Sequence, residues 1–152
     1  MKSKKYFWYT AGAYSIIIML ISMAVLFNIY PGGYGYIYNE ETEQITLERG
    51  VFGKEQVTDQ VADNEALSYV LYQNEVDRAI QSWILVLTLG IFIVYLVQRI
   101  WPAYQNRKEE GYKVKDLIAL GLFVLTVVVA VSLLVSLSQS IQYLEQVYNT
   151  VA

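Results

Sequence analysis

Three long apolar runs without a charged side chain dominate the pattern of this chain. They cover residues 9–29, 80–97 and 117–137, and none contains Asp, Glu, Lys, Arg or His. As a helix, about 18 or more such residues can cross the ~30 Å hydrocarbon core of a bilayer. The sequence therefore predicts an all-α membrane protein with three transmembrane helices. The first run is longer than a typical signal-peptide core and lacks a small-x-small cleavage site, so we expect it to remain as an anchor.

The segments between the runs carry opposite charge, which predicts the orientation of the chain. Residues 1–8 contain three Lys and no acid. Segment 30–79 has ten acidic and three basic residues, a net charge of −7, whereas segment 98–116 has five basic and three acidic residues, a net charge of +2. Lys and Arg collect in cytoplasmic loops. We therefore expect an N-in/C-out topology, with 1–8 and 98–116 in the cytoplasm and 30–79 and the tail 138–152 outside.

The acidic segment 30–79 is predicted to form a small extracytoplasmic domain. The composition of 34–38 and 44–48 is β-like, and the polar stretch 39–43 between them predicts a turn, so a β-hairpin is expected. Two glycines, at 50 and 53, are expected to end its second strand. A two-stranded hairpin is marginal in water on its own. It is therefore expected to rest on the membrane, on the helices of the chain or on a partner.

A long helix is predicted to lead from this domain into the second span. No Pro or Gly occurs between positions 54 and 90, so the helix can run without a break over about 59–98 before the segment 99–102, with its proline, ends it. Its apolar stripe is expected to cover the hairpin, with a partner helix as the alternative. The tail 138–152 keeps apolar residues at helical spacing and is expected to extend the third helix along the second.

The residue types that are missing exclude several kinds of chemistry. The chain has no Cys and no His, which excludes disulfides, thiolate sites and histidine acid–base or metal chemistry. Proton relays and ion coupling inside a membrane use ionisable side chains, and the three runs have none. A site built of carboxylates remains possible only outside the spans. We therefore expect no enzyme activity, no cofactor and no metal, and the few cations argue against a nucleic-acid partner.

Small residues in the apolar runs are predicted to mediate helix packing. Without a hydrophobic driving force in lipid, small side chains let helix backbones approach, and hydroxyl groups can bond across the contact. In the third run serines recur at every fourth position. A polar path for a substrate is the alternative, and the absence of accompanying charge argues against it. The packing candidates are Ser15, Ser22, Gly90, Ser132, Ser136 and Ser140.

The role predicted from these features is that of a non-catalytic accessory or scaffold subunit of a larger membrane assembly. Tyrosine is common at interface hot spots, which makes Tyr34, Tyr36 and Tyr38 the candidate partner anchors. Packing within the hairpin or contact with the membrane surface is their alternative role. The expected partners are other integral membrane proteins, a second copy of the chain, and anionic lipid attracted by the basic segment 98–116 at ~1 kcal/mol per cation.

Two other functions stay open from the sequence. A membrane immunity protein would bind an exported toxin or peptide at the acidic outer face, since a net charge of −7 favours a cationic ligand. A small oligomeric transporter or channel would need several copies to line a path. The Lys-rich start and the absence of Cys and of glycosylation sequons favour the plasma membrane of a bacterium.

Overall fold

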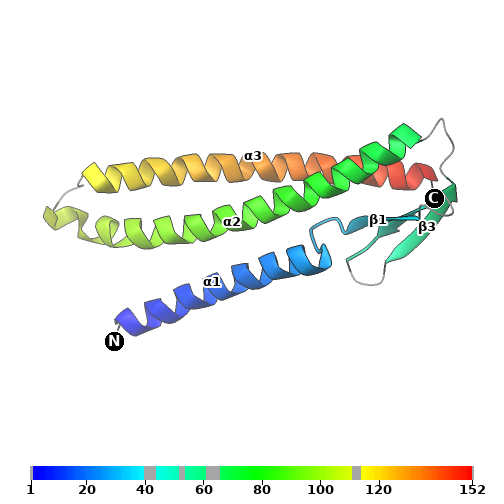
Figure 1. Ribbon diagram of the computed structural model, residues 1–152. Helices are drawn as coiled ribbons and strands as arrows, with labels where there is room; N and C mark the ends of the chain where they lie inside the picture. The colour runs from blue at the N-terminus through cyan, green and yellow to red at the C-terminus, as the bar shows by residue number, and fades with distance from the viewer. Residues whose placement is uncertain (1, 40–43, 52–53, 61–65, 111–113, 152) are drawn as a thin grey trace.

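The computed structural model of the chain contains three long helices with a small antiparallel sheet at one end (Figure 1). The structure describes residues 2–39, 44–51, 54–60, 66–110 and 114–151. The helices are α1 (Lys2–Phe27), α2 (Ala66–Glu110) and α3 (Val114–Val151). Each is long and apolar enough to cross a membrane. The chain is therefore a multi-pass membrane protein as predicted, while its orientation stays a prediction.

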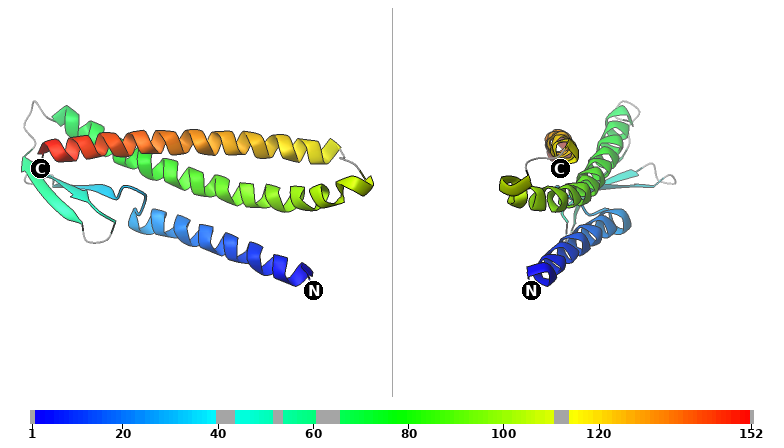
Figure 2. Two further views of the ribbon diagram at one scale, coloured as in Figure 1. Left: turned by 180° about the vertical axis from the view of Figure 1, so that it is seen from behind. Right: turned by 90° about the vertical axis from the view of Figure 1, so that its left-hand side faces the viewer.

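Over most of its length α2 lies between α1 and α3, and near the sheet it crosses α3 (Figure 1 and the left-hand view of Figure 2). It packs against the antiparallel α3 along most of its length, and against α1 over a shorter stretch. The buried side chains of α3 recur at intervals of three, four or seven residues, the spacing of a helix seam. These residues are Ala119, Thr126, Ala130, Leu137, Ser140, Leu144 and Tyr148. Several are small, which brings the two helix backbones together.

The helix α2 differs from its predicted bounds at both ends. It begins at Ala66, because part of the expected first turn instead forms the strand β3 (Glu55–Gln60). At the other end it continues through Pro102 to Glu110. A proline inside a helix removes one backbone hydrogen bond and disfavours the regular geometry, and here the helix continues past it. Proline was therefore a poor marker of the helix end in this chain.

The sheet is a three-stranded antiparallel meander in the order β1-β2-β3, so the fold is helical with a small sheet and not all-α. The first two strands, β1 (Tyr34–Asn39) and β2 (Gln44–Arg49), match the predicted hairpin, with Tyr34 opposite Arg49 and Asn39 opposite Gln44. The predicted turn residues 40–43 and the glycine at 53 lie outside the described residues. The third strand was not predicted, since Val57 is the only apolar residue of its sequence.

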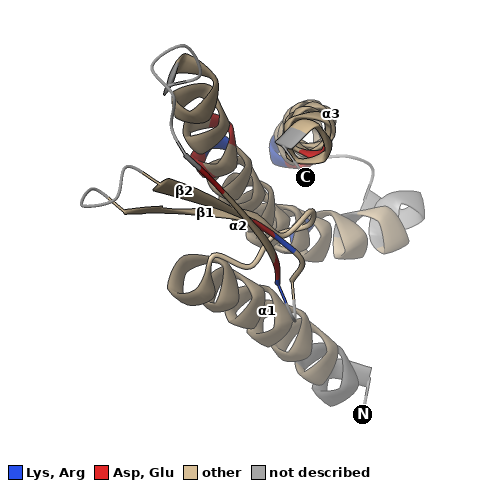
Figure 3. Ribbon diagram, turned by 90° about the vertical axis from the view of Figure 1, so that its right-hand side faces the viewer, with Lys and Arg blue, Asp and Glu red and all other residues tan. Residues whose placement is uncertain are grey.

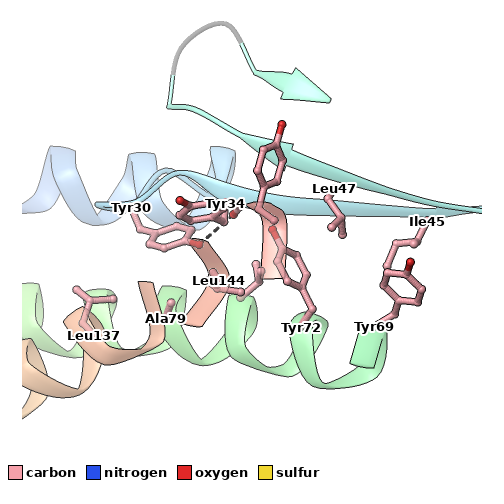
Figure 4. Close-up of a cluster of buried hydrophobic side chains, with 11 residues drawn as sticks. Tyr30, Tyr34, Ile45, Leu47, Tyr69, Tyr72, Ala79, Leu137 and Leu144 are labelled. Atoms are coloured by element: carbon pink, nitrogen blue, oxygen red, sulfur yellow. Dashed lines mark hydrogen bonds between the residues drawn. The ribbon is translucent and has the colours of Figure 1, made fainter. Parts of the chain in front are cut away.

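The core of the molecule lies between the sheet and the adjoining ends of α2 and α3 (Figure 4). Tyrosine supplies much of it. The buried residues are Tyr30, Tyr34, Ile45, Leu47, Tyr69, Tyr72, Val76, Ala79, Leu137, Leu144 and Tyr148. The second helix covers the hairpin, but near its start it does so with Tyr69 and Tyr72, whereas the leucines of the predicted apolar stripe stay exposed. The tail extends α3 to pack beside this helix. The sheet, too small to be stable alone, obtains its core from the helices.

Candidate functional site

A tight turn fixes the sheet to the end of α1. The backbone N–H of Gly33 donates to the carbonyl of Tyr30 at 3.2 Å, and Gly32 has a φ of 113°. Pro at the second position and a positive φ at the third are the features of a type II turn. The N–H of Gly50 then donates to the carbonyl of Gly33 at 3.0 Å, which extends the pairing of β1 with β2. The orientation of the sheet on the helices is set here.

The three predicted anchor tyrosines occupy every second position of β1, and their exposure to solvent increases toward the end of the strand. Tyr34 is buried, with its ring edge-on to Tyr148 at 6.2 Å between centroids. Tyr36 is half-buried and hydrogen-bonds Asp77 of α2. Only Tyr38 is open, with 45% of its surface exposed. The structure therefore places Tyr34 in the packing role that was its alternative and leaves Tyr38 as the accessible candidate.

Two of the buried tyrosines make short hydrogen bonds through their hydroxyl groups. Tyr30 donates to the carbonyl of Tyr34 at 3.0 Å, and Tyr69 donates to the carboxylate of Asp59 at 2.8 Å. A buried tyrosine normally needs such a partner. The burial of Tyr69 was missed from the sequence, although its spacing from the buried residues of α2 was the available signal.

A cavity of about 250 Å³ lies where the end of α1, the start of β1 and the helix α2 meet. Its lining includes the charged side chains of Glu48, Lys54 and Asp77 and the polar residues Asn28 and Tyr36. A side chain at Gly35 would approach the carboxylate of Glu48 to 3.0 Å, so glycine leaves space for the charged pair. Figure 3 shows that charged residues gather in the sheet and in the neighbouring parts of α2 and α3.

Glu48 is the buried charged side chain of this cavity. Lys54 and Gln56 both donate to its carboxylate, the latter at 2.9 Å. Burial would raise the pKa of Glu48, but the hydrogen bonds from Lys54 and Gln56 and the charge of Lys54 together hold that pKa below its ordinary value of 4.5. For Tyr36, burial and then the negative charge of Asp77 raise the pKa. The ion pair of Glu48 and Lys54 joins β2 to the start of β3.

Replacing Glu48 by glutamine is expected to remove one source of acid sensitivity from the sheet end. The lowered pKa means that the charged form is favoured in the folded state, so its contribution to stability is complete above pH 4.5 and is lost as the pH falls through the lower folded value. The Glu48→Gln protein should be less stable than wild type at pH 7. The difference should shrink below pH 4.5 in thermal unfolding of the full chain in detergent. A difference that is constant from pH 7 to pH 3 would contradict this role.

The predicted packing residues of the apolar runs fall into two groups. Gly90 faces α1, where a side chain would come within 3.8 Å of Ile17. Ser140 is buried and donates to the carboxylate of Glu75 on α2 at 2.8 Å. Ser136 lines the α2–α3 groove beside it. These three lie at helix contacts.

For the remaining three packing candidates, the structure describes no contact with a neighbouring helix like those of Gly90, Ser136 and Ser140. Ser22 donates to the carbonyl of Ile18 and Ser132 to that of Val128, each within its own helix. Ser15 is exposed. A hydroxyl bonded to its own helix is satisfied without a neighbour. The four-residue spacing of the serines was therefore a weaker guide than the seam of α3.

The exposed apolar side chains and the grooves between the helices offer surfaces for binding. Within the described ranges, no three acidic side chains come together as a metal site would require. Comparison of the chain with protein-family models, with curated proteins and with solved structures finds no match. The functional interpretation therefore rests on the geometry of the chain itself.

Proposed function

We propose that this chain is a non-catalytic accessory or scaffold subunit of a larger membrane assembly. In this proposal the helices anchor it N-in/C-out in a bacterial plasma membrane, and the sheet end binds a partner outside. One observation carries it: three apolar side chains of α2 are exposed beyond the expected level of the membrane. They are Leu67 at 71%, Val70 at 50% and Leu71 at 47%, hereafter the α2 stripe.

The length of α1 supports the position assumed for the outer edge of the hydrocarbon core. Its apolar part, Trp8–Phe27, is 20 residues long, which as a helix is about 30 Å and matches the hydrocarbon core. Phe27 at the end of α1 and Ile80 of α2 line the same cavity, so the two residues lie at a similar depth relative to the membrane. Leu67 lies 13 residues before Ile80, about 20 Å further along the helix axis at 1.5 Å per residue. Lipid tails would not reach it there.

The α2 stripe has the spacing of one helix face, with positions separated by three and four residues. The sequence predicted that the longer apolar stripe of this helix covers the hairpin. Its members Val76 and Ala79 are buried in the core. Nearer the start of α2, however, Tyr69 and Tyr72 take that place, and Leu67 and Leu71 are exposed. Leu71 also lines a groove of about 400 Å³ between α2 and α3. An exposed apolar face beside a groove is typical of a helix-binding surface. Tyr38 gives a second exposed contact on the sheet.

Replacing Leu67 and Leu71 by glutamine is expected to release the partner without unfolding the chain. Both side chains are exposed, so the change should alter stability by less than about 0.5 kcal/mol. The measurement is quantitative mass spectrometry of membrane proteins that co-purify with the tagged full chain from native membranes in mild detergent. We expect at least a tenfold loss of partner. Tyr38→Ser tests the sheet surface in the same way.

Val114→Gln is the control, because it also replaces an exposed apolar side chain by glutamine, at the start of α3 away from the sheet. It should leave partner recovery unchanged. The proposal fails if the wild-type chain is recovered alone, or if the double variant and the control retain the same partners in the same amounts.

A further inference from the structure

We infer that the groove between α2 and α3 at the end away from the sheet is a binding site for one anionic phospholipid. The groove has a volume of about 360 Å³. Arg99 from α2 and Lys115 from α3 both line it, and no carboxylate does among the side chains that the structure describes. The rest of its wall is apolar or aromatic: Phe92, Tyr95, Leu96, Ile118, Ala119 and Leu122.

The two cations lack an anionic partner in the part of the chain that the structure describes. The salt bridges there join other residues, and Asp116, which follows Lys115 in sequence, does not line the groove. Lys115 also lies in the first turn of α3, where the helix dipole disfavours a cation. Neither helix stability nor ion pairing therefore explains why these two side chains line one groove. A bound negative charge would stabilise both.

The depth of the groove matches a phospholipid. Trp101 and Tyr104 are exposed just beyond Arg99, and such aromatic residues collect at the headgroup level. Arg99 and Lys115 therefore lie at the level of lipid phosphates. Phe92 lies seven residues before Arg99, about 10 Å deeper along α2 at 1.5 Å per residue.

The wall below the cations suits an acyl chain. The rings of Phe92 and Tyr95 are stacked, with 6.2 Å between centroids and 21° between planes. Ala119 is small and buried at the helix contact. A lipid would place its phosphate between the cations and one chain along the stacked rings. Basic pockets between membrane helices bind anionic headgroups in this way, whereas a free phosphate would leave the apolar wall unused.

The test is native mass spectrometry of the full chain in detergent, titrated with phosphatidylglycerol or with phosphatidylcholine of the same acyl chains. We expect tighter binding of phosphatidylglycerol. Arg99→Gln and Lys115→Gln should each reduce that preference about fivefold, and the double variant about 25-fold, the factors given by ~1 kcal/mol per cation. Phe92→Ala should weaken the binding of both lipids and keep the preference, because it changes only the chain-binding wall.

Arg78→Gln is the matched control, since Arg78 is an exposed cation on the same helix near the sheet. It should leave the preference intact. An equal loss in this control would show general charge attraction and overturn the site, as would an unchanged preference in the double variant. Displacement of the lipid by sodium phosphate, but not by sodium chloride at equal ionic strength, would assign the groove to a soluble anion and overturn the lipid.

Discussion

Replacing Gly33 by alanine is expected to lower the free energy of unfolding of the sheet end by about 3 kcal/mol. Gly33 has a φ of 64°, in the left-handed region that side chains disfavour. An added Cβ would also lie 2.8 Å from the carbonyl carbon of Gly50 and 2.8 Å from the nitrogen of Val51. Both are backbone atoms, which cannot rotate away. Relieving the contact requires the start of β1 to separate from the end of β2.

The measurement is amide hydrogen exchange of the full chain in detergent, read over the peptides of β1 and β2. A loss of about 3 kcal/mol corresponds to exchange roughly a hundredfold faster. Gly12→Ala is the control, because its Cβ would meet nothing within 4 Å in the middle of α1. Alanine should be neutral or favourable there, by up to ~1 kcal/mol. Equal exchange rates in the two variants would show that the turn does not hold the sheet.

The sequence was sufficient for the elements that depend on local pattern. The absence of charge over 9–29, 80–97 and 117–137 predicts the three helices, because burial in lipid penalises any ionisable residue. The hairpin of β1 and β2 followed from β-like runs around a polar stretch. The strand β3 could not be found in the same way. Its polar sequence becomes a strand by pairing with β2, for example through Val57 opposite Leu47, and that contact is not local.

The candidate site was harder to predict, because burial there depends on how the helices meet the sheet. Tyr34 and Tyr38 lie four positions apart on one face of β1, and this spacing does not say which end of the strand the helices cover. On α2, leucine and tyrosine compete for the same core. The larger ring of Tyr72 fills the space under the sheet and Leu71 remains outside. A hydrophobicity pattern predicts the reverse, with Leu71 buried and Tyr72 exposed, because hydrophobicity scales rank leucine as more apolar than tyrosine.

Replacing Tyr72 by alanine is expected to detach the sheet from the helices, with a loss of about 4 kcal/mol. Its side chain is fully buried in the core between α2 and the sheet (Figure 4). Truncating a large aromatic residue there leaves a cavity that the rigid helix α2 cannot close. The measurement is near-ultraviolet circular dichroism of the full chain in detergent during urea unfolding, since packed tyrosines give this signal. The transition should move to much lower urea.

Tyr72→Phe distinguishes the contribution of the ring to stability from that of its hydroxyl group. The hydroxyl lies 3.5 Å from the carbonyl oxygen of Gly35, at the outer limit of a hydrogen bond, so its removal should cost less than about 1 kcal/mol. Tyr38→Ala controls for the loss of one tyrosine signal, because that ring is largely outside the core. If phenylalanine is as damaging as alanine, the hydroxyl rather than the packing of the ring joins α2 to β1. If neither change moves the transition, the sheet is held mainly by its turn at Gly33.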